Sequence, residues 1–374
     1  MSRLRAGNGW SLTRAVVACT LALLAAGEPL RGQSRTETSF ASRVERFSEP
    51  GGYFDTDNLI SNERSYLHPL DALRERGVNG GVYIGVGPDQ NFSYIAQVRP
   101  SVAFIVDVRR DNMLLHLLFK ALFMMSRDRT EYLSLLFARP PPEADRSSKD
   151  GAGKTDLRSL VQHFDAQRPS PAQVESIRAP LHATIAGFGV PLSTADRETI
   201  NRFHRTFIDS GLSLKFQSAG RAPRSVYPTY RDLLLETDRS GNQANYLASD
   251  AAFQVVKKLQ AQDQVIPVVG NLAGDRALAS IARLMIERGD RLSAFYLSNV
   301  ELYLWQDGAF PQFMTNLARL PSGPRSVVIR AVFGTTIDES VPGYYSTSVV
   351  QPVADLVRNH QQGRYRSYWS LIAR

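Results

Sequence analysis

The sequence predicts an α/β protein of three layers, in which helices cover both faces of a mostly parallel sheet. Short apolar, β-prone runs alternate with segments of helical periodicity at both ends of the chain, and this alternation is typical of parallel sheets. Between the two alternating regions the pattern is mainly helical. A largely helical insertion is therefore expected to divide the sheet-forming sequence into two halves.

The first alternating region contains a strand, a glycine turn, a helix and a second strand. Val82 to Val86 is apolar and is broken by glycine, and Asn91 to Val98 has room for two helical turns. Val102 to Val106 forms a second apolar run that ends at Asp107. The next segment, Arg110 to Met125, is apolar almost all round, which indicates a buried helix against the sheet.

The predicted insertion spans residues 127–262, after which the alternation resumes in residues 263–374. Helix-start signatures such as Ser170-Pro171 support helices in the insertion, with a short extended piece at 212–217. The expected strands of the second half are 264–269, 292–297, 326–332 and a final strand 365–372. The expected helices of that half are 277–288, 309–320 and 353–359.

The N-terminus resembles an export signal. Three arginines precede the apolar stretch Ala15 to Ala26, and small residues follow it, so residues 1–27 are predicted to be a signal peptide. Residues 28–46 are polar and are interpreted as a linker, with the first half of the sheet domain at 47–126. The expected location is outside the cytoplasm if the signal is used, and cytoplasmic otherwise. No stable membrane span is expected after its removal.

Composition limits the function classes. The chain has 374 residues, a net charge of +8 without a concentrated basic run, and a single cysteine within the predicted signal. A nucleic-acid partner is therefore not indicated, and a mature chain without cysteine excludes thiolate catalysis. The six histidines lack metal-ligand spacing, so no metal site is expected. His116, on an apolar helix, is interpreted as a core residue.

The glycine turn after the first strand is the first candidate site. Gly85 and Gly87 permit close approach of backbone to a ligand, and Asp107 lies where an acidic side chain accepts hydrogen bonds from ribose hydroxyls. Any strand-to-helix turn can use glycine, so a structural role is the alternative. Three polar residues start the helix and either cap it or contact the ligand: Asp89, Gln90 and Asn91.

The second candidate site follows the strand 292–297. Ser298 and Asn299 are expected to face a ligand at the carboxyl edge of the sheet, or else to cap the next helix; Asn299 and Glu301 are the candidate catalytic residues, with Glu301 as a possible base. A third polar cluster, 55–58 with 61–63, suggests a flap over the site. Turn and cap roles would explain that cluster equally well.

Three motifs together resemble the class I S-adenosylmethionine-dependent methyltransferase superfamily, and more specifically a poorly characterised bacterial branch of it. They are Gly51-Gly52-Tyr53-Phe54-Asp55, Gly85-Val86-Gly87-Pro88 and Ser298-Asn299-Val300-Glu301. The resemblance covers about 47–139 and 262–335. It implies a Rossmann-type sheet, S-adenosylmethionine as a methyl donor, and contacts from Gly85 and Gly87 to its methionine part. It also implies that Asp107 holds the ribose and that residues 298–301 face the substrate or methyl group.

The chain departs from the superfamily pattern at three places. Tyr83 stands where many members have an acidic residue, Gln90 replaces the third glycine, and the terminal antiparallel hairpin is reduced to one predicted strand. Export would also separate the protein from the cytosolic methyl donor. The sequence thus leaves two functions open: methyl transfer to an unknown acceptor, and an exported binding or structural protein that keeps the scaffold without turnover.

Overall fold

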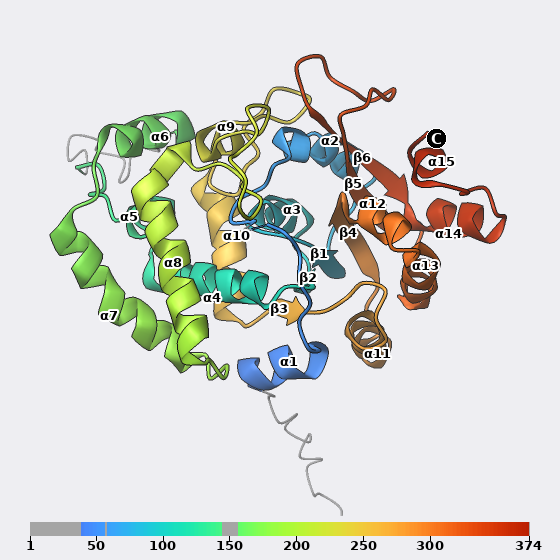
Figure 1. The fold of residues 1–374 in the computed structure, drawn as a ribbon, viewed down its shortest axis with the longest axis horizontal. Coiled ribbons are helices and arrows are strands. Elements are labelled where there is room, and N and C mark those ends of the chain that lie inside the picture. Colours follow the sequence, from blue (N-terminus) through green and yellow to red (C-terminus); the bar gives the residue numbers. More distant parts are fainter. Residues whose placement is uncertain (1–38, 57, 144–155, 374) are drawn as a thin grey trace, which may run out of the picture. The chain divides into compact units, whose positions relative to one another are not determined.

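A six-stranded sheet forms the centre of the molecule (Figure 1). The computed structural model describes residues 39–56, 58–143 and 156–373, which belong to one compact unit, Ser39–Arg374. The predicted signal peptide and the start of the linker lie outside the described residues. The strand order is β3-β2-β1-β4-β5-β6. The strands are β1 Val82–Gly85, β2 Val102–Asp107, β3 Val265–Val269, β4 Leu292–Ser298, β5 Val327–Phe333 and β6 Ser346–Pro352.

The first five strands are parallel, as the sequence predicts, and only β6 runs antiparallel to its neighbour β5. In the register of the sheet, Val82 of β1 lies beside Val102 of β2 and Leu292 of β4. These strands are buried almost throughout, which explains why they read as continuous apolar runs rather than alternating ones. The chain moves outward from β1 to β3 and then returns to β4, so the two halves of the sheet diverge between β1 and β4.

Helices lie on both faces of the sheet (Figure 1). The first connections pack on one face as α3 Gln90–Val98, α4 Arg110–Met125 and α10 Asp250–Ala261. The later connections pack on the other as α11 Ala277–Arg288, α13 Phe310–Arg319 and α14 Val353–Gln361. A change of face follows from right-handed crossovers when the chain reverses its direction across the sheet. The short helices η1 Arg64–Leu67 and α2 Pro69–Glu75 lie against β6, and α12 Val300–Gln306 follows β4.

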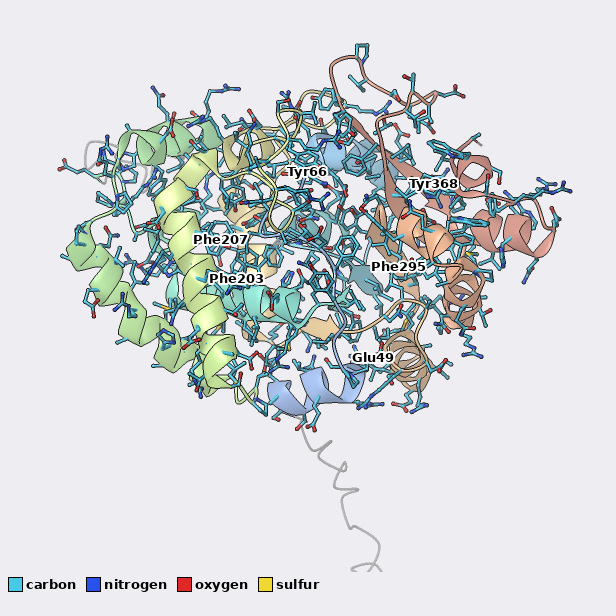
Figure 2. The ribbon with its side chains drawn as sticks, in the orientation of Figure 1. Glu49, Tyr66, Phe203, Phe207, Phe295 and Tyr368 are labelled. Carbon is cyan, nitrogen blue, oxygen red and sulfur yellow. The ribbon has the colours of Figure 1, made fainter. Side chains whose placement is uncertain are left out.

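The described part of the insertion is mainly helical, as predicted, and it packs chiefly on α4. Phe203 and Phe207 of its helix Thr194–Ser210 are buried (Figure 2). The Phe207 ring packs edge to face against Phe119 of α4, with 5.9 Å between ring centroids. The irregular loop 215–229 and the hydroxyls of Tyr230 and Tyr246 reach the carboxyl edge of the sheet. The insertion helices are α5 Arg129–Phe137, α6 Leu157–Ala166, α7 Pro171–Gly187, α8 Thr194–Ser210 and α9 Tyr230–Leu234.

The predicted linker is wrong over its last residues, because helix α1 occupies Phe40–Phe47. Ser39 caps this helix, and its apolar residues Phe40, Val44 and Phe47 share one buried face against β3 and α11. These apolar residues have the spacing of an amphipathic helix. Because polar residues precede and separate them, the segment resembles a linker in the sequence. This segment therefore belongs to the folded unit.

The C-terminal region also differs from the prediction. The expected final strand 365–372 contains helix α15 Tyr368–Ile372 instead, and Ser367 and Ser370 form its capping box. The antiparallel edge strand is β6, which the sequence analysis missed. The extended piece expected at 212–217 is reduced to the short helix η2 Gly211–Ser213 and one bridge between Lys215 and Thr229. None of the helices in the described ranges has the length and apolar character needed to cross a membrane.

Candidate ligand site at the carboxyl edge of the sheet

One segment, residues 49–63, crosses the carboxyl ends of the strands. Glu49 (Figure 2) donates its backbone N–H to Val269 at the end of β3, and Gly52 donates to Val108 just after β2. Farther along, Leu59 and Ile60 are buried, and the Glu63 carboxylate accepts a hydrogen bond from Ser298 at the end of β4. The polar cluster predicted to be a flap is therefore part of a covering segment that is partly embedded in the sheet edge. Residue 57 lies outside the described ranges.

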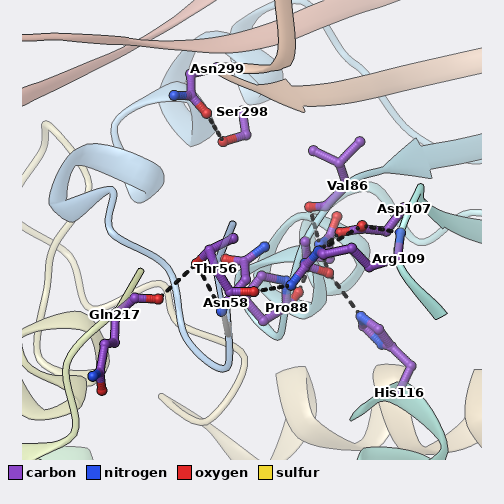
Figure 3. A network of polar contacts seen from close by, with 12 residues as sticks. Thr56, Asn58, Val86, Pro88, Asp107, Arg109, His116, Gln217, Ser298 and Asn299 are labelled. Carbon is purple, nitrogen blue, oxygen red and sulfur yellow. Dashed lines mark hydrogen bonds and ion pairs between the residues drawn. The ribbon is translucent and has the colours of Figure 1, made fainter. Parts of the chain in front are cut away.

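A cavity of about 660 Å³ opens between this segment and the insertion loop. Its walls come from the covering segment, from the first turn of α4 and from the loop at 217–219. Thr56 donates a hydrogen bond to the Gln217 carbonyl at 2.9 Å, which ties two of these walls together (Figure 3). The lining residues are Gly51, Gly52, Tyr53, Phe54, Thr56, Arg109, Arg110, Asp111, Gln217, Ser218 and Ala219.

Gly85 has a structural explanation at the end of β1. A Cβ atom there would lie 1.9 Å from Asn91 Oδ1 and 2.8 Å from the Tyr83 ring. Asn91 fills this space because its Nδ2 donates to the carbonyls of Val86 and Pro88 at 2.9 and 2.7 Å, while its Oδ1 accepts from the Tyr83 hydroxyl at 2.8 Å. Asn91 is fully buried and holds the turn from inside. Gly85 and Asn91 therefore serve the turn itself rather than facing the cavity.

Gly87 is needed for its backbone conformation, with φ of +81°. Its carbonyl accepts a hydrogen bond from His116 Nε2 at 2.9 Å (Figure 3). Burial lowers the pKa of His116 to about 4, although this hydrogen bond partly offsets the effect. His116 also packs edge to face against Phe92 and Phe119. It is a core residue, as predicted.

Asp89 and Gln90 point to different neighbours. Asp89 occupies the N-cap position of α3 without capping it, and its Oδ2 accepts from the hydroxyls of Tyr230 at 2.6 Å and Tyr246 at 3.2 Å. Burial raises the pKa of Asp89 to about 6. Gln90 donates through Nε2 to the Tyr296 hydroxyl at 3.2 Å, while its buried Oε1 accepts no hydrogen bond from the described residues. Asp89 thus binds the insertion, and Gln90 reaches β4.

Asp107 lies beside the glycine turn but is already paired. Its two carboxylate oxygens accept from Nε and Nη2 of Arg109 at 3.1 and 2.8 Å, and Oδ1 also accepts the Arg109 backbone N–H at 2.9 Å (Figure 3). Arg109 Nη1 donates to the Thr56 carbonyl and lines the cavity. A carboxylate retains further lone pairs for a ligand hydroxyl. Of this pair, however, it is Arg109 that lines the cavity, and Arg109 is not among the residues predicted from the sequence.

Ser298 ends β4 in a conformation that is rare for a residue other than glycine, with φ of +52°. Its Oγ donates to Glu63 and contacts Asn299 Oδ1 at 3.3 Å. Asn299 occupies the N-cap position of α12, but its side chain makes no capping hydrogen bond. Ser298 and Asn299 are set apart from the Asp107–Arg109 pair in Figure 3. One link from Ser298 to the glycine turn runs through Glu63, Tyr296 and Gln90.

Glu301 is buried in an ion pair. Its oxygens accept from Arg330 Nε at 2.5 Å and Nη2 at 3.0 Å, and both side chains are only 1% exposed. Arg330 Nη1 donates in turn to Gln351 Oε1, so the pair joins α12, β5 and β6. A base must take up a proton and reach its substrate, and this carboxylate is placed for neither.

The sequence predicts Glu63 only as part of a flap, but the structure places its carboxylate against Ser298 at the end of β4. Its burial depends on partners more than 200 residues away in sequence, so no local pattern could reveal it. Within the described ranges no group of histidine, cysteine, aspartate and glutamate side chains is arranged to hold a metal ion.

The chain is thus an α/β protein with a cavity beside the carboxyl ends of its parallel strands. The model of a family described as "Domain of unknown function (DUF7790)" matches residues 59–374, so the chain belongs to that family. A search of curated proteins finds no match.

Proposed function

We propose that this protein is methyltransferase-like in fold and binds a nucleoside-containing small molecule in the 660 Å³ cavity, with S-adenosylmethionine as the first candidate. The observation that carries the proposal is the position of this cavity beside the Asp107–Arg109 pair at the carboxyl end of β2. Open α/β sheets bind ligands outside the carboxyl ends of their strands. The cavity volume is also within the range of small-molecule sites.

The lining residues suit the parts of such a ligand. Phe54 offers a ring for a base, and it is fixed by edge-to-face contact with Tyr303 at 4.7 Å. The exposed Asp111 of the cavity wall, and Asp107 behind the lining residue Arg109, offer acceptors for ribose hydroxyls or for an amino group. The Arg109 guanidinium offers donors. S-adenosylmethionine would supply an electrophilic methyl group on a sulfonium centre. The protein's own contribution would be to orient donor and acceptor.

A thermal-shift titration of residues 28–374 with S-adenosylmethionine and S-adenosylhomocysteine tests the proposal. Ligand at a hundred times its dissociation constant is expected to stabilise the fold by about 2.7 kcal/mol. Ala219→Trp, which fills the cavity from an exposed position, should abolish the shift. The matched control is Ala222→Trp, in the same loop but outside the cavity lining, and it should retain the shift. No shift up to millimolar ligand, or a shift insensitive to Ala219→Trp, contradicts the proposal.

The alternative is an exported binding protein without turnover, and the covering segment favours it. Leu59 and Ile60 are buried where this segment passes over the sheet edge, and Asn91 fills the space beside Gly85. Both features reduce the room above β1, where the superfamily resemblance would place the methionine part. In this case ligand binding would occur without methyl transfer. The mass of the chain isolated from cells would also show the loss of the first 27 residues.

A further inference from the structure

The carboxyl group of Glu63 is buried, and no cationic side chain of the described residues forms an ion pair with it. Its side chain is 1% exposed, Oε1 accepts a hydrogen bond from Ser298 Oγ, and Oε2 accepts none from the described residues. Burial raises the pKa of Glu63 to about 7, although the nearby hydroxyls of Ser298 and Tyr296 partly offset this effect. Glu63 therefore changes its protonation state near neutral pH, where a proton acceptor works best.

The described side chains that interact electrostatically with Glu63 are mainly phenols. They come from β1, α3, β4 and α15, and burial raises the pKa of each of them: Tyr83, Tyr94, Tyr296 and Tyr368. The adjacent Arg64 binds Glu236 instead, with Nε 2.9 Å from Oε2. Gln90, which is hydrogen-bonded to Tyr296, contributes a second buried oxygen without a donor. Two unsatisfied acceptors fit a molecule that donates hydrogen bonds.

Ser298 connects this buried carboxyl to the sheet edge. It is only half-buried, it lies where β4 passes into α12, and the pairing of β4 with β5 is irregular just before it. A left-handed conformation at a serine costs about 1–2 kcal/mol, and such strain is concentrated at functional sites. While Ser298 Oγ donates its proton to Glu63, its lone pairs remain able to accept one from another molecule.

We propose that Ser298 and Glu63 form a proton-accepting pair for a methyl acceptor that carries a hydroxyl or amino group. This inference rests on the proposed methyl transfer. The acceptor's oxygen or nitrogen forms a bond to the methyl carbon, the carbon–sulfur bond of the donor breaks, and its electron pair stays on sulfur. The acceptor's proton passes to Ser298 Oγ, and the Ser298 proton passes to Glu63 Oε1. Glu63 thereby takes the role that the sequence assigned to Glu301.

A chain of contacts links this pair to the cavity. Asn299 follows Ser298 and contacts its hydroxyl, and the Asn299 side chain lowers the pKa of the Tyr303 hydroxyl, against the effect of burial. Tyr303 packs in turn against Phe54 of the cavity wall. The proton-accepting pair and the donor cavity are therefore connected along one edge through Asn299, Tyr303 and Phe54. An acceptor would approach Ser298 from the side of the Phe54–Tyr303 contact.

Two measurements on residues 28–374 test this inference. The first is a ¹³C NMR titration of glutamate carboxyl groups, in which one signal should titrate near pH 7, vanish in Glu63→Gln and move to higher pH in Ser298→Ala. The second uses S-adenosylmethionine with a labelled methyl group and a panel of alcohols, phenols and primary amines. Turnover should rise about tenfold per pH unit below pH 7, and Glu63→Gln should lower it by about 100-fold or more. Glu236→Gln, which alters another buried carboxylate, should leave turnover unchanged.

The outcomes separate the two proposals. Donor-induced thermal stabilisation that survives in Glu63→Gln, together with loss of turnover, supports both. Thermal stabilisation without turnover on the panel, or with turnover that Glu63→Gln leaves unchanged, overturns the proton-accepting pair and leaves ligand binding intact. Absence of any glutamate signal that titrates between pH 6 and 8 also overturns the pair. Absence of thermal stabilisation overturns the proposed function, and the inference about the methyl acceptor with it.

Discussion

Two buried glutamates, Glu63 and Glu301, flank the end of β4, and they differ in what compensates the desolvation of their carboxylates. Glu301 is 1% exposed and its charge is balanced by two hydrogen bonds from Arg330. Glu63 is equally buried but receives one hydrogen bond from a serine and faces phenols. Burial of an ion is tolerated when a partner compensates it, and otherwise the group is driven toward its neutral form. The comparison shows that Glu301 holds the strands together, whereas Glu63 is able to exchange a proton.

Removal of the cation from the first pair is expected to have the largest effect. Arg330→Ala leaves the Glu301 carboxylate buried without compensation and should lower the free energy of unfolding by about 3–5 kcal/mol at pH 7. Urea unfolding followed by circular dichroism measures the loss. The double variant Arg330→Met with Glu301→Leu should lose less than the single one. An Arg330→Ala chain as stable as the parent would show that the pair is not the structural element that we describe.

Glu63→Gln should change how stability depends on pH. Because the pKa of Glu63 is raised to about 7 in the folded chain from 4.5 in a model peptide, its favourable contribution is present at low pH and is lost as pH rises toward 7. Between pH 4.5 and 8 the parent should therefore lose roughly 3 kcal/mol more unfolding free energy than Glu63→Gln. Asp89 titrates in the same range in both chains, so its effect cancels in the difference. If the unfolding free energies of the two chains depend on pH in the same way, the pKa of Glu63 is not raised in the folded chain.

A smaller effect is expected at the residue that contacts Glu63. Ser298→Ala and Ser298→Gly both remove the hydroxyl, but only glycine relieves the backbone strain at φ of +52°. Ser298→Gly should therefore be more stable than Ser298→Ala by about 1 kcal/mol in the same urea assay. Equal stability of the two variants would mean that the turn after β4 is not strained.

The sequence predicts the parallel half of the fold well. Helices α4 and α11 have the predicted bounds, and all five parallel strands are confirmed within a few residues, because buried parallel strands and the helices that pack on them have strong local patterns. Strand β6 was missed because it is polar. Its serines are paired with Ser65 of η1, whose Oγ lies 2.9 Å from the hydroxyls of Ser346 and Ser348. The aromatic residues of 365–372 favoured a strand, but the Ser367 cap starts a helix there.

The candidate site was less predictable than the fold. Polar residues at strand ends marked the correct edge, since the carboxyl ends of parallel strands always meet on one side. Their individual roles depend on contacts made by tertiary folding. The Asn91 side chain fills the space beside Gly85, and Arg109 forms an ion pair with Asp107. Ser298 donates a hydrogen bond to Glu63 of the covering segment. A linear sequence contains no signal for which of these groups is left unsatisfied.

The double phenol contact at Asp89 couples two distant parts of the chain. Tyr230 and Tyr246 belong to the insertion, yet their hydroxyls converge on one carboxylate at the start of α3. Any displacement of the turn after β1, whatever drives it, would pull on α9 and on the segment before α10. The insertion and the glycine turn are therefore structurally coupled through Asp89. Substitutions that displace α9 or the segment before α10 would also displace the glycine turn.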